Sequence, residues 1–103
     1  MILYSVTVSI EPTVAEDWLS WMRSVHIPEV MATNCFVESR LSQILVEPEN
    51  GISYSIMYVC PSQELMDEYN SKHAPRLQKD HAQRYEGRFA AFRTLLNVIE
   101  EFK

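Results

Sequence analysis

Residues 35–60 read CFVESRLSQILVEPENGISYSIMYVC, and this run decides the expected fold. Alternating side chains over Cys35–Val46 and again over Ile52–Cys60 predict two β-strands. The intervening segment, Glu47–Gly51, ends in Asn-Gly, a pair that supplies the positive φ angles of a tight turn. The middle of the chain is therefore predicted to be an antiparallel hairpin.

A strand and a helix are predicted before this hairpin. Apolar side chains occupy every second position of Ile2–Ile10 and form one strongly apolar face, which is typical of a strand. Thr13 and Glu16 have the spacing of a capping box, which predicts the start of a helix. The apolar face of that helix consists of Val14, Trp18, Trp21, Met22 and Val25. Because proline cannot donate the helical hydrogen bond, we expect a kink or break at His26-Ile27-Pro28.

A second helix and a last strand are predicted after the hairpin. Ser62 is the expected N-cap of the helix, which continues to about Tyr85 with a kink or break at Pro75. Gly87 is the expected stop. The segment from about Ala90 to Val98 favours a strand, and a third helix is the alternative because the segment also contains good helix formers. No internal repeat is found.

The predicted order of strand, helix, strand, strand, helix and strand is that of a ferredoxin-like α+β fold. Its four-stranded antiparallel sheet carries both helices on one face. Large apolar side chains nevertheless occur on both faces of the predicted strands, as Tyr58 and Met57 illustrate. Such strands are normally covered on both sides, so we expect the second face to pack on another copy of the chain in a homodimer. The 103 residues are expected to form one domain.

Composition argues against several classes of function. Gly51 and Gly87 are the only glycines, so the sequence contains neither of the common Gly-rich phosphate-binding motifs. The net charge of −5 gives no electrostatic basis for nucleic-acid binding, and no apolar run is long enough to span a membrane. Two cysteines, Cys35 and Cys60, are fewer than a small secreted disulfide scaffold carries. We therefore expect a cytoplasmic protein with buried, reduced thiols.

The run Trp18–Met31, WLSWMRSVHIPEVM, resembles the signature W-x-x-W-M-x-x-x-H-I-P-(D/E)-V of a small bacterial domain-of-unknown-function family. Arg40-Leu41, the step Ala74-Pro75-x-Leu77, His81 and Phe89–Leu96 are similar to the same family. Members of that family resemble the dimeric α/β-barrel superfamily, which implies two ferredoxin-like sheets that face each other across a dimer. The superfamily contains cofactor-independent monooxygenases, haem-degrading enzymes, dehalogenating and isomerising enzymes and simple ligand binders. Fold alone does not choose among these activities.

The three histidines are the first candidates for chemistry. His26, His73 and His81 lack the spacing of a helical zinc pair, so we expect no metal site. Haem-degrading relatives use a helix histidine near the position of His73, but no second haem-specific residue is matched, and we expect no cofactor. We interpret His26 and His81 as caps of helix ends, with a role as catalytic base as the alternative.

Three charged residues lie inside predicted strands, namely Glu38, Arg40 and Arg93. On a sheet that faces a dimer interior they would be buried, and a buried charge needs a partner. Arg40 and Arg93 could then bind a carboxylate, either that of Glu38 or that of a ligand. No base is placed by the sequence beside a serine or cysteine, so nucleophilic catalysis is unsupported.

The sequence leaves three functions open. The first is a homodimeric barrel that binds a small, partly apolar molecule. Its candidate ligand-binding residues are Arg40, Arg93, Glu38, His26 and His81. The second is a cofactor-independent monooxygenase-like enzyme that acts on a flat aromatic substrate. The third is a non-catalytic structural or interaction module whose apolar interior leaves no room for a ligand.

Overall fold

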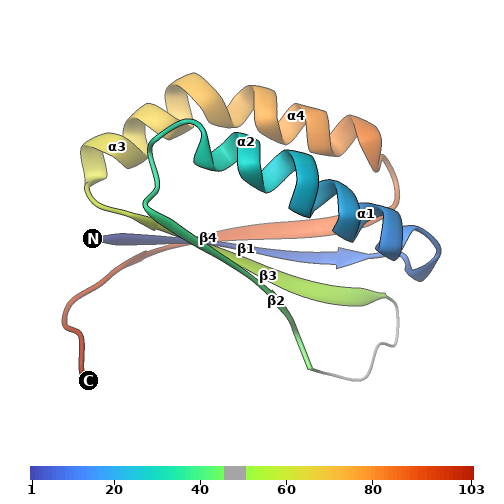
Figure 1. Cartoon of the computed structure of the whole chain (residues 1–103), viewed down its shortest axis with the longest axis horizontal. Helices are drawn as coiled ribbons and strands as arrows, with labels where there is room; N and C mark the ends of the chain where they lie inside the picture. Colours follow the sequence, from blue (N-terminus) through green and yellow to red (C-terminus); the bar gives the residue numbers. More distant parts are fainter. Residues whose placement is uncertain (46–50) are drawn as a thin grey trace.

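A computed structural model describes residues 1–45 and 51–103 as a four-stranded antiparallel sheet with helices on one face (Figure 1). The strands are β1 (Ile2–Ile10), β2 (Glu38–Gln43), β3 (Ile52–Cys60) and β4 (Phe89–Asn97), in the spatial order β2-β3-β1-β4. This is the predicted ferredoxin-like fold, and the last segment is a strand rather than a third helix. Of the predicted turn Glu47–Gly51, all but Gly51 lies outside the described residues.

Two long helical segments cover the sheet, and each runs through its proline. The first consists of η1 (Pro12–Val14), α1 (Ala15–Trp21), η2 (Met22–His26) and α2 (Ile27–Met31). The second consists of α3 (Gln63–Glu68), η3 (Tyr69–His73) and α4 (Ala74–Arg84). Both η2 and η3 are π-helical turns, in which the Ile27 and Ala74 N–H groups bond to the carbonyl oxygen five residues earlier. These wide turns give the prolines that follow them room inside a continuous helix.

Of the kink or break predicted at His26-Ile27-Pro28, the structure excludes the break, because the π-helical turn accommodates the proline and the helix continues to Met31. At the second proline the backbone distortion lies at His73, two residues before Pro75. His73 has φ −120° and ψ −42°, whereas Ala74 keeps helical angles of −56° and −43°.

The two helix starts differ from each other. Ser62 caps α3 as predicted, because its hydroxyl oxygen accepts a hydrogen bond of 3.3 Å from the Leu65 N–H. The capping box predicted at Thr13 and Glu16 does not form. A short 3₁₀ turn precedes α1 instead, and the Glu11 carbonyl accepts from the Val14 N–H at 3.1 Å. Backbone groups thus take over part of the bonding that the box would have supplied.

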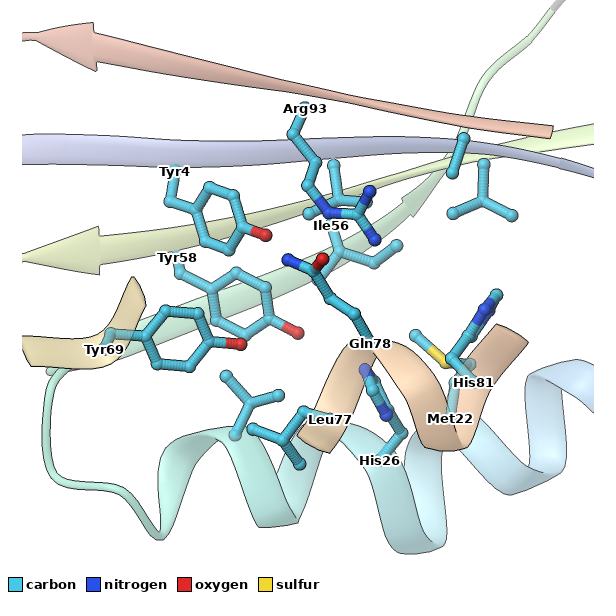
Figure 2. Close-up of a pocket in the computed structure, with 14 residues that line it drawn as sticks. Tyr4, Met22, His26, Ile56, Tyr58, Tyr69, Leu77, Gln78, His81 and Arg93 are labelled. Carbon is cyan, nitrogen blue, oxygen red and sulfur yellow. The ribbon is translucent and has the colours of Figure 1, made fainter. Parts of the chain in front are cut away.

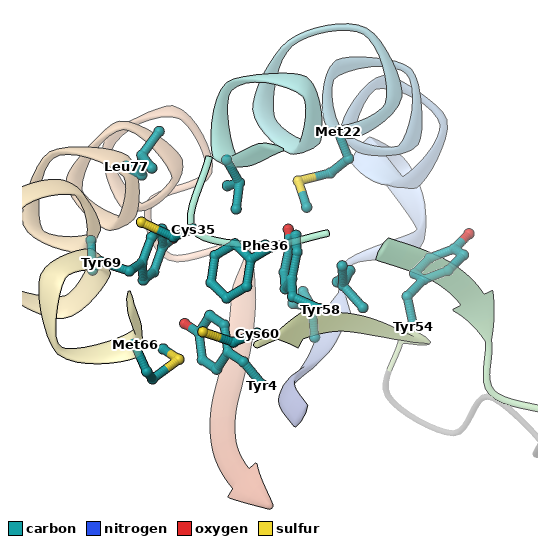
Figure 3. Packing of buried hydrophobic residues seen from close by; sticks show 14 of the residues in the cluster. Tyr4, Met22, Cys35, Phe36, Tyr54, Tyr58, Cys60, Met66, Tyr69 and Leu77 are labelled. Carbon is teal, nitrogen blue, oxygen red and sulfur yellow. The ribbon is translucent and has the colours of Figure 1, made fainter. Parts of the chain in front are cut away.

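The strand predicted for Cys35–Val46 is shorter in the structure, where β2 covers Glu38–Gln43. Cys35 and Phe36 lie before it in a loop that enters the core, and both are buried. The Phe36 ring lies 5.0 Å from that of Tyr58 and 4.8 Å from that of Tyr69 (Figure 3). Because Phe36 packs into the core beside the buried Cys35, the alternation of buried and exposed side chains does not extend back to these residues. Val37, the next residue, points to solvent.

The sheet has one covered and one uncovered face. Side chains of β1 and β3 that face the helices form the sheet side of the core: Ile2, Tyr4, Val8, Ile10, Tyr54, Ile56, Tyr58 and Cys60. The register of the strands places Leu3, Met57, Val59, Phe92 and Leu96 together on the other face. Phe92 is 64% exposed and Leu96 is 44% exposed. The strands are thus apolar on both faces, as predicted, and the helices cover only one.

The two halves of the chain repeat one local feature that the sequence patterns do not reveal. His26-Ile27-Pro28-Glu29 and His73-Ala74-Pro75-Arg76 occupy equivalent positions at the end of each π-helical turn. The last residues of the two runs, Glu29 and Arg76, form an ion pair of 3.3 Å between the helical segments. Two matching residues, the histidine and the proline, are too few to register as a sequence repeat, and the fold makes the match visible.

The helix-to-sheet packing predicts a large cost for truncating Leu77, which is 1% exposed. Leu77→Ala is expected to lower the free energy of unfolding by about 3 kcal/mol, because lost burial and a residual cavity add. Urea denaturation followed by circular dichroism measures the change. Leu45→Ala is the control, because Leu45 is exposed and should change stability by less than about 0.5 kcal/mol. Equal effects of the two substitutions would contradict this packing.

Candidate functional site

A hollow opens between the covered face of the sheet and the helices (Figure 2). We call it the central hollow. Fourteen residues line it: Tyr4, Val6, Val8, Met22, His26, Val30, Ile56, Tyr58, Tyr69, Leu77, Gln78, His81, Ala91 and Arg93. Its open volume is about 30 Å³, which is room for about one or two water molecules.

Three tyrosines form one wall of the central hollow. Tyr4, Tyr58 and Tyr69 are only 5%, 3% and 3% exposed, and their hydroxyl groups point to the same side in Figure 2. None of these hydroxyls has a hydrogen-bond partner among the described residues. Ser39 Oγ is the one fully enclosed side-chain atom without a partner in that part of the chain, so the tyrosine hydroxyls reach the open space of the hollow. Each of them needs a water or a ligand atom as its partner.

Burial affects the protonation of two of these tyrosines. It raises the pKa values of Tyr58 and Tyr69 well above the ordinary value, and the neighbouring tyrosine hydroxyls act in the same direction. Both phenols therefore stay neutral at physiological pH. A neutral phenol can donate a hydrogen bond into the hollow as well as accept one.

His81 lies on α4 and forms the floor of the site. Its Nε2 accepts a buried hydrogen bond of 2.9 Å from the indole N–H of Trp18. Accepting requires a lone pair on Nε2, so the ring is neutral and carries its proton on Nδ1. Burial, together with the nearby His26 and Arg93, lowers the pKa of His81 to about 4. The predicted role as a helix-end cap is wrong, because the imidazole bonds to the Trp18 indole and to no backbone carbonyl of the described residues.

His26 enters the hollow from the π-helical turn η2. Its ring stacks on Trp21 at 5.1 Å and lies 5.7 Å from the ring of His81. Burial lowers its pKa, although the nearby Glu29 acts in the opposite direction. The imidazole makes no hydrogen bond to the described residues, so the expected capping of helix-end carbonyls is wrong here too. The wider turn also changes the phase of the helix, which leaves Val25, a predicted core residue, exposed.

The charged residues of the strands separate onto opposite faces of the sheet. Arg93 pairs with Val6 in the register of β4 and β1, and it lines the mouth of the central hollow. Arg40 pairs with Met57 on the uncovered face, where it forms an exposed ion pair of 3.4 Å with Glu38. Of the five predicted ligand-binding residues, the structure thus brings together His26, His81 and Arg93. It places Arg40 and Glu38 on the far side of the sheet.

The sequence patterns did not indicate the tyrosine wall or Gln78. Tyr4 and Tyr58 share the alternation of their strands, and that pattern alone assigns them to the core. A signal was present, however, because a phenol on a buried face must find a partner for its hydroxyl. Three such residues directed at the same region predict a polar site inside the core rather than a dry interior.

Residues 1–45 and 51–103 hold neither a cluster of metal-ligating side chains nor a helix suited to cross a membrane. In this part of the chain, no group of three His, Cys, Asp or Glu residues could hold a metal ion. Nor is any of its helices long and apolar enough to cross a membrane. Cys35 and Cys60 are both buried and unpaired, as expected.

Comparison with known proteins identifies the fold and a family. The model of the family DUF4286, described as a domain of unknown function, matches residues 1–99. A dimeric ferredoxin-like protein from an uncultured marine organism is 15% identical, with a TM-score of 0.72, and the match covers 100% of this chain and 99% of that one. A variant of SnoaB, a cofactor-independent oxygenase from Streptomyces nogalater, is 15% identical, with a TM-score of 0.68 and coverage of 97% and 94%.

A third structure extends this comparison. An ethyl tert-butyl ether D family protein from Bacillus halodurans is 12% identical, with a TM-score of 0.64 and coverage of 99% and 100%. No curated protein matches the sequence. At these identities the likeness establishes the fold and not an activity.

The buried, neutral state of His81 predicts that the folded protein loses stability at acid pH. Its folded-state pKa lies below the unfolded value of 6.5, so the unfolded chain binds a proton that the folded chain does not. Stability should be complete above about pH 6.5 and fall by about 2–3 kcal/mol as the pH decreases toward 4. Urea denaturation across this range measures the loss. His81→Gln keeps an acceptor for Trp18 but removes the titrating group, so its pH dependence should be shallower. If the free energy of unfolding of this variant depends on pH as steeply as that of the wild type, His81 is not the group responsible for the loss.

Proposed function

Because the chain belongs to the DUF4286 family, whose description assigns no activity, we propose a function from the geometry of the central hollow. The protein binds a small, partly apolar molecule between its sheet and its helices. One observation carries this proposal: the hydroxyls of Tyr4, Tyr58 and Tyr69 open into the hollow without partners among the described residues. A buried polar group without a partner costs about 1–3 kcal/mol, so this wall is suited to the polar part of a ligand.

The remaining lining matches the apolar part of such a molecule. Aliphatic side chains surround the tyrosine wall: Val6, Val8, Val30, Ile56, Leu77 and Ala91. Arg93 and Gln78 extend toward each other from the sheet and from α4 (Figure 2). The open volume of about 30 Å³ is well below the usual range of about 300–1,000 Å³ for ligand pockets, so these two unbranched side chains must rotate outward to admit a molecule larger than water.

The uncovered face of the sheet supports the second part of the proposal, which is a homodimer. Phe92 and Leu96 are exposed large apolar side chains, and both lie on this face. Figure 1 shows the C-terminal residues leaving β4 on the same side, and they carry Ile99 and Phe102, 93% and 85% exposed. A second copy would bury this surface in a self-complementary interface. A protein of the same fold is described as dimeric.

Methionine methyl NMR tests ligand binding, because Met22 lines the central hollow whereas Met57 lies on the uncovered face. In protein labelled with ¹³C-methyl methionine, phenol is expected to shift the Met22 signal and leave that of Met57 unchanged. Tyr58→Phe should weaken phenol binding about threefold to tenfold, the effect of one lost hydrogen bond. Tyr54→Phe is the matched control, since Tyr54 is buried but does not line the hollow. No shift of Met22 would contradict the site.

Light scattering during gel filtration tests the dimer. The wild-type chain should elute with twice the mass of 12.0 kDa. Phe92→Asp should give a monomer, because a carboxylate in the apolar interface would be desolvated without a partner. Val25→Asp introduces the same charge on an exposed helical position away from the sheet and should leave the dimer intact. A monomeric wild type would contradict this part of the proposal.

A second candidate function is cofactor-independent oxygenation of a flat aromatic substrate. It is favoured by the neutral imidazole of His26, which faces the same hollow as the phenols and could take a proton from a quinol. Arg93 would then stabilise the resulting anion. One structure of the same fold is described as a cofactor-independent oxygenase, which supports this candidate only as a fold relative.

Oxygen uptake separates the second candidate from the first. With 1,4-dihydroxynaphthalene as the probe, an oxygenase should consume oxygen faster than buffer alone, and His26→Ala should lower the protein-dependent rate at least about a hundredfold. Binding without any protein-dependent uptake would reject the oxygenase and leave the binding function in place.

A further inference from the structure

The charge distribution around the central hollow points to the chemical class of its ligand. Among the fourteen lining residues, Arg93 is the one that carries a formal charge at neutral pH. No Asp or Glu lines the hollow, and both histidines there are neutral. The chain as a whole has 14 acidic and 9 basic residues. A positive interior within an acidic protein attracts anions and excludes cations.

Arg93 also lacks a counter-ion among the described residues. Each of four other arginines lies within 4 Å of a carboxylate: Arg40, Arg76, Arg84 and Arg88. The charge of Arg93 acts on groups inside the hollow, since it adds to the effect of burial in lowering the pKa values of His26 and His81. Arg93 is an exposed residue, and its guanidinium points toward Gln78 in Figure 2, where it can contact both water and an entering anion.

The polar groups beside Arg93 are suited to donate hydrogen bonds. The hydroxyls of Tyr4, Tyr58 and Tyr69 have no acceptor among the described residues, and the Gln78 amide lies beside the guanidinium in Figure 2. A carboxylate offers about four acceptor positions, which matches a guanidinium fork plus phenolic donors. A phosphate dianion would enter a hollow with only one cation, and its second charge would stay unbalanced.

We propose that the ligand of the central hollow is a monocarboxylate with a small apolar body. Its carboxylate binds to Arg93 and to the tyrosine hydroxyls, and its apolar part contacts the aliphatic walls. This inference rests on the proposed ligand-binding function and adds the charge and valence of the ligand. It assigns no role in binding to Arg40, which lies on the opposite face of the sheet.

Benzoate and benzamide test the proposal, because they share size and shape and differ in charge. Binding is followed by the ¹³C-methyl signal of Met22 in the wild-type dimer, in Arg93→Gln and in Arg23→Gln. Arg23 is the matched control, since it is exposed and does not line the hollow. Benzoate should bind the wild type at least about tenfold more tightly than benzamide does. Arg93→Gln should weaken benzoate binding about tenfold to a hundredfold and leave benzamide binding unchanged. Arg23→Gln should change neither.

The outcomes separate this inference from the function on which it rests. If benzamide binds as tightly as benzoate, or if Arg93→Gln has no effect on benzoate, the hollow is a binding site but its ligand is not an anion. If inorganic phosphate displaces benzoate from the Met22 site at equal affinity, the assignment to a carboxylate is overturned. If no probe shifts Met22 in the wild type, the inference and the proposed function both fail.

Discussion

The hydrogen bond from the Trp18 indole to the His81 imidazole is the interaction on which the interior depends. It joins the first helical segment to the second above the sheet, and both partners are buried. Because the bond occupies the Nε2 lone pair, His81 must stay neutral. This neutrality leaves Arg93 as the one formal charge of the central hollow. A single buried contact thus sets both the spacing of the helices and the electrostatics of the site.

Two π-helical turns connect the prolines to the candidate site. Pro28 and Pro75 each follow a widened turn, and these turns supply three of the lining residues, namely Met22, His26 and Tyr69. Each π-helical turn shifts the residues that follow it by about one position around the helix axis. Without these turns, other side chains would face the sheet. The strain that proline introduces into a helix is therefore resolved at the same places where the hollow is formed.

The sheet divides the molecule into two surfaces with different chemistry. Its covered face contributes tyrosines and Arg93 to an enclosed polar region, whereas its uncovered face carries an apolar surface around Phe92 and one exposed ion pair. Successive residues of a strand point to opposite faces, so whether a side chain lies on the covered or the uncovered face depends on its position in the alternation. Arg40 and Arg93 look alike as charged residues within strands, and the register places them on opposite sides.

The sequence by itself determined the element order, the four strands, the Ser62 cap and the two-sided apolar character of the sheet. Those features follow from periodicities of two and about 3.6 residues, which are local properties of the chain. Only the tertiary structure decided that Phe36 enters the core, that Val25 turns outward, and that the tyrosines meet Arg93. These placements depend on strand register, helix phase and contacts between distant segments, and no local pattern encodes them.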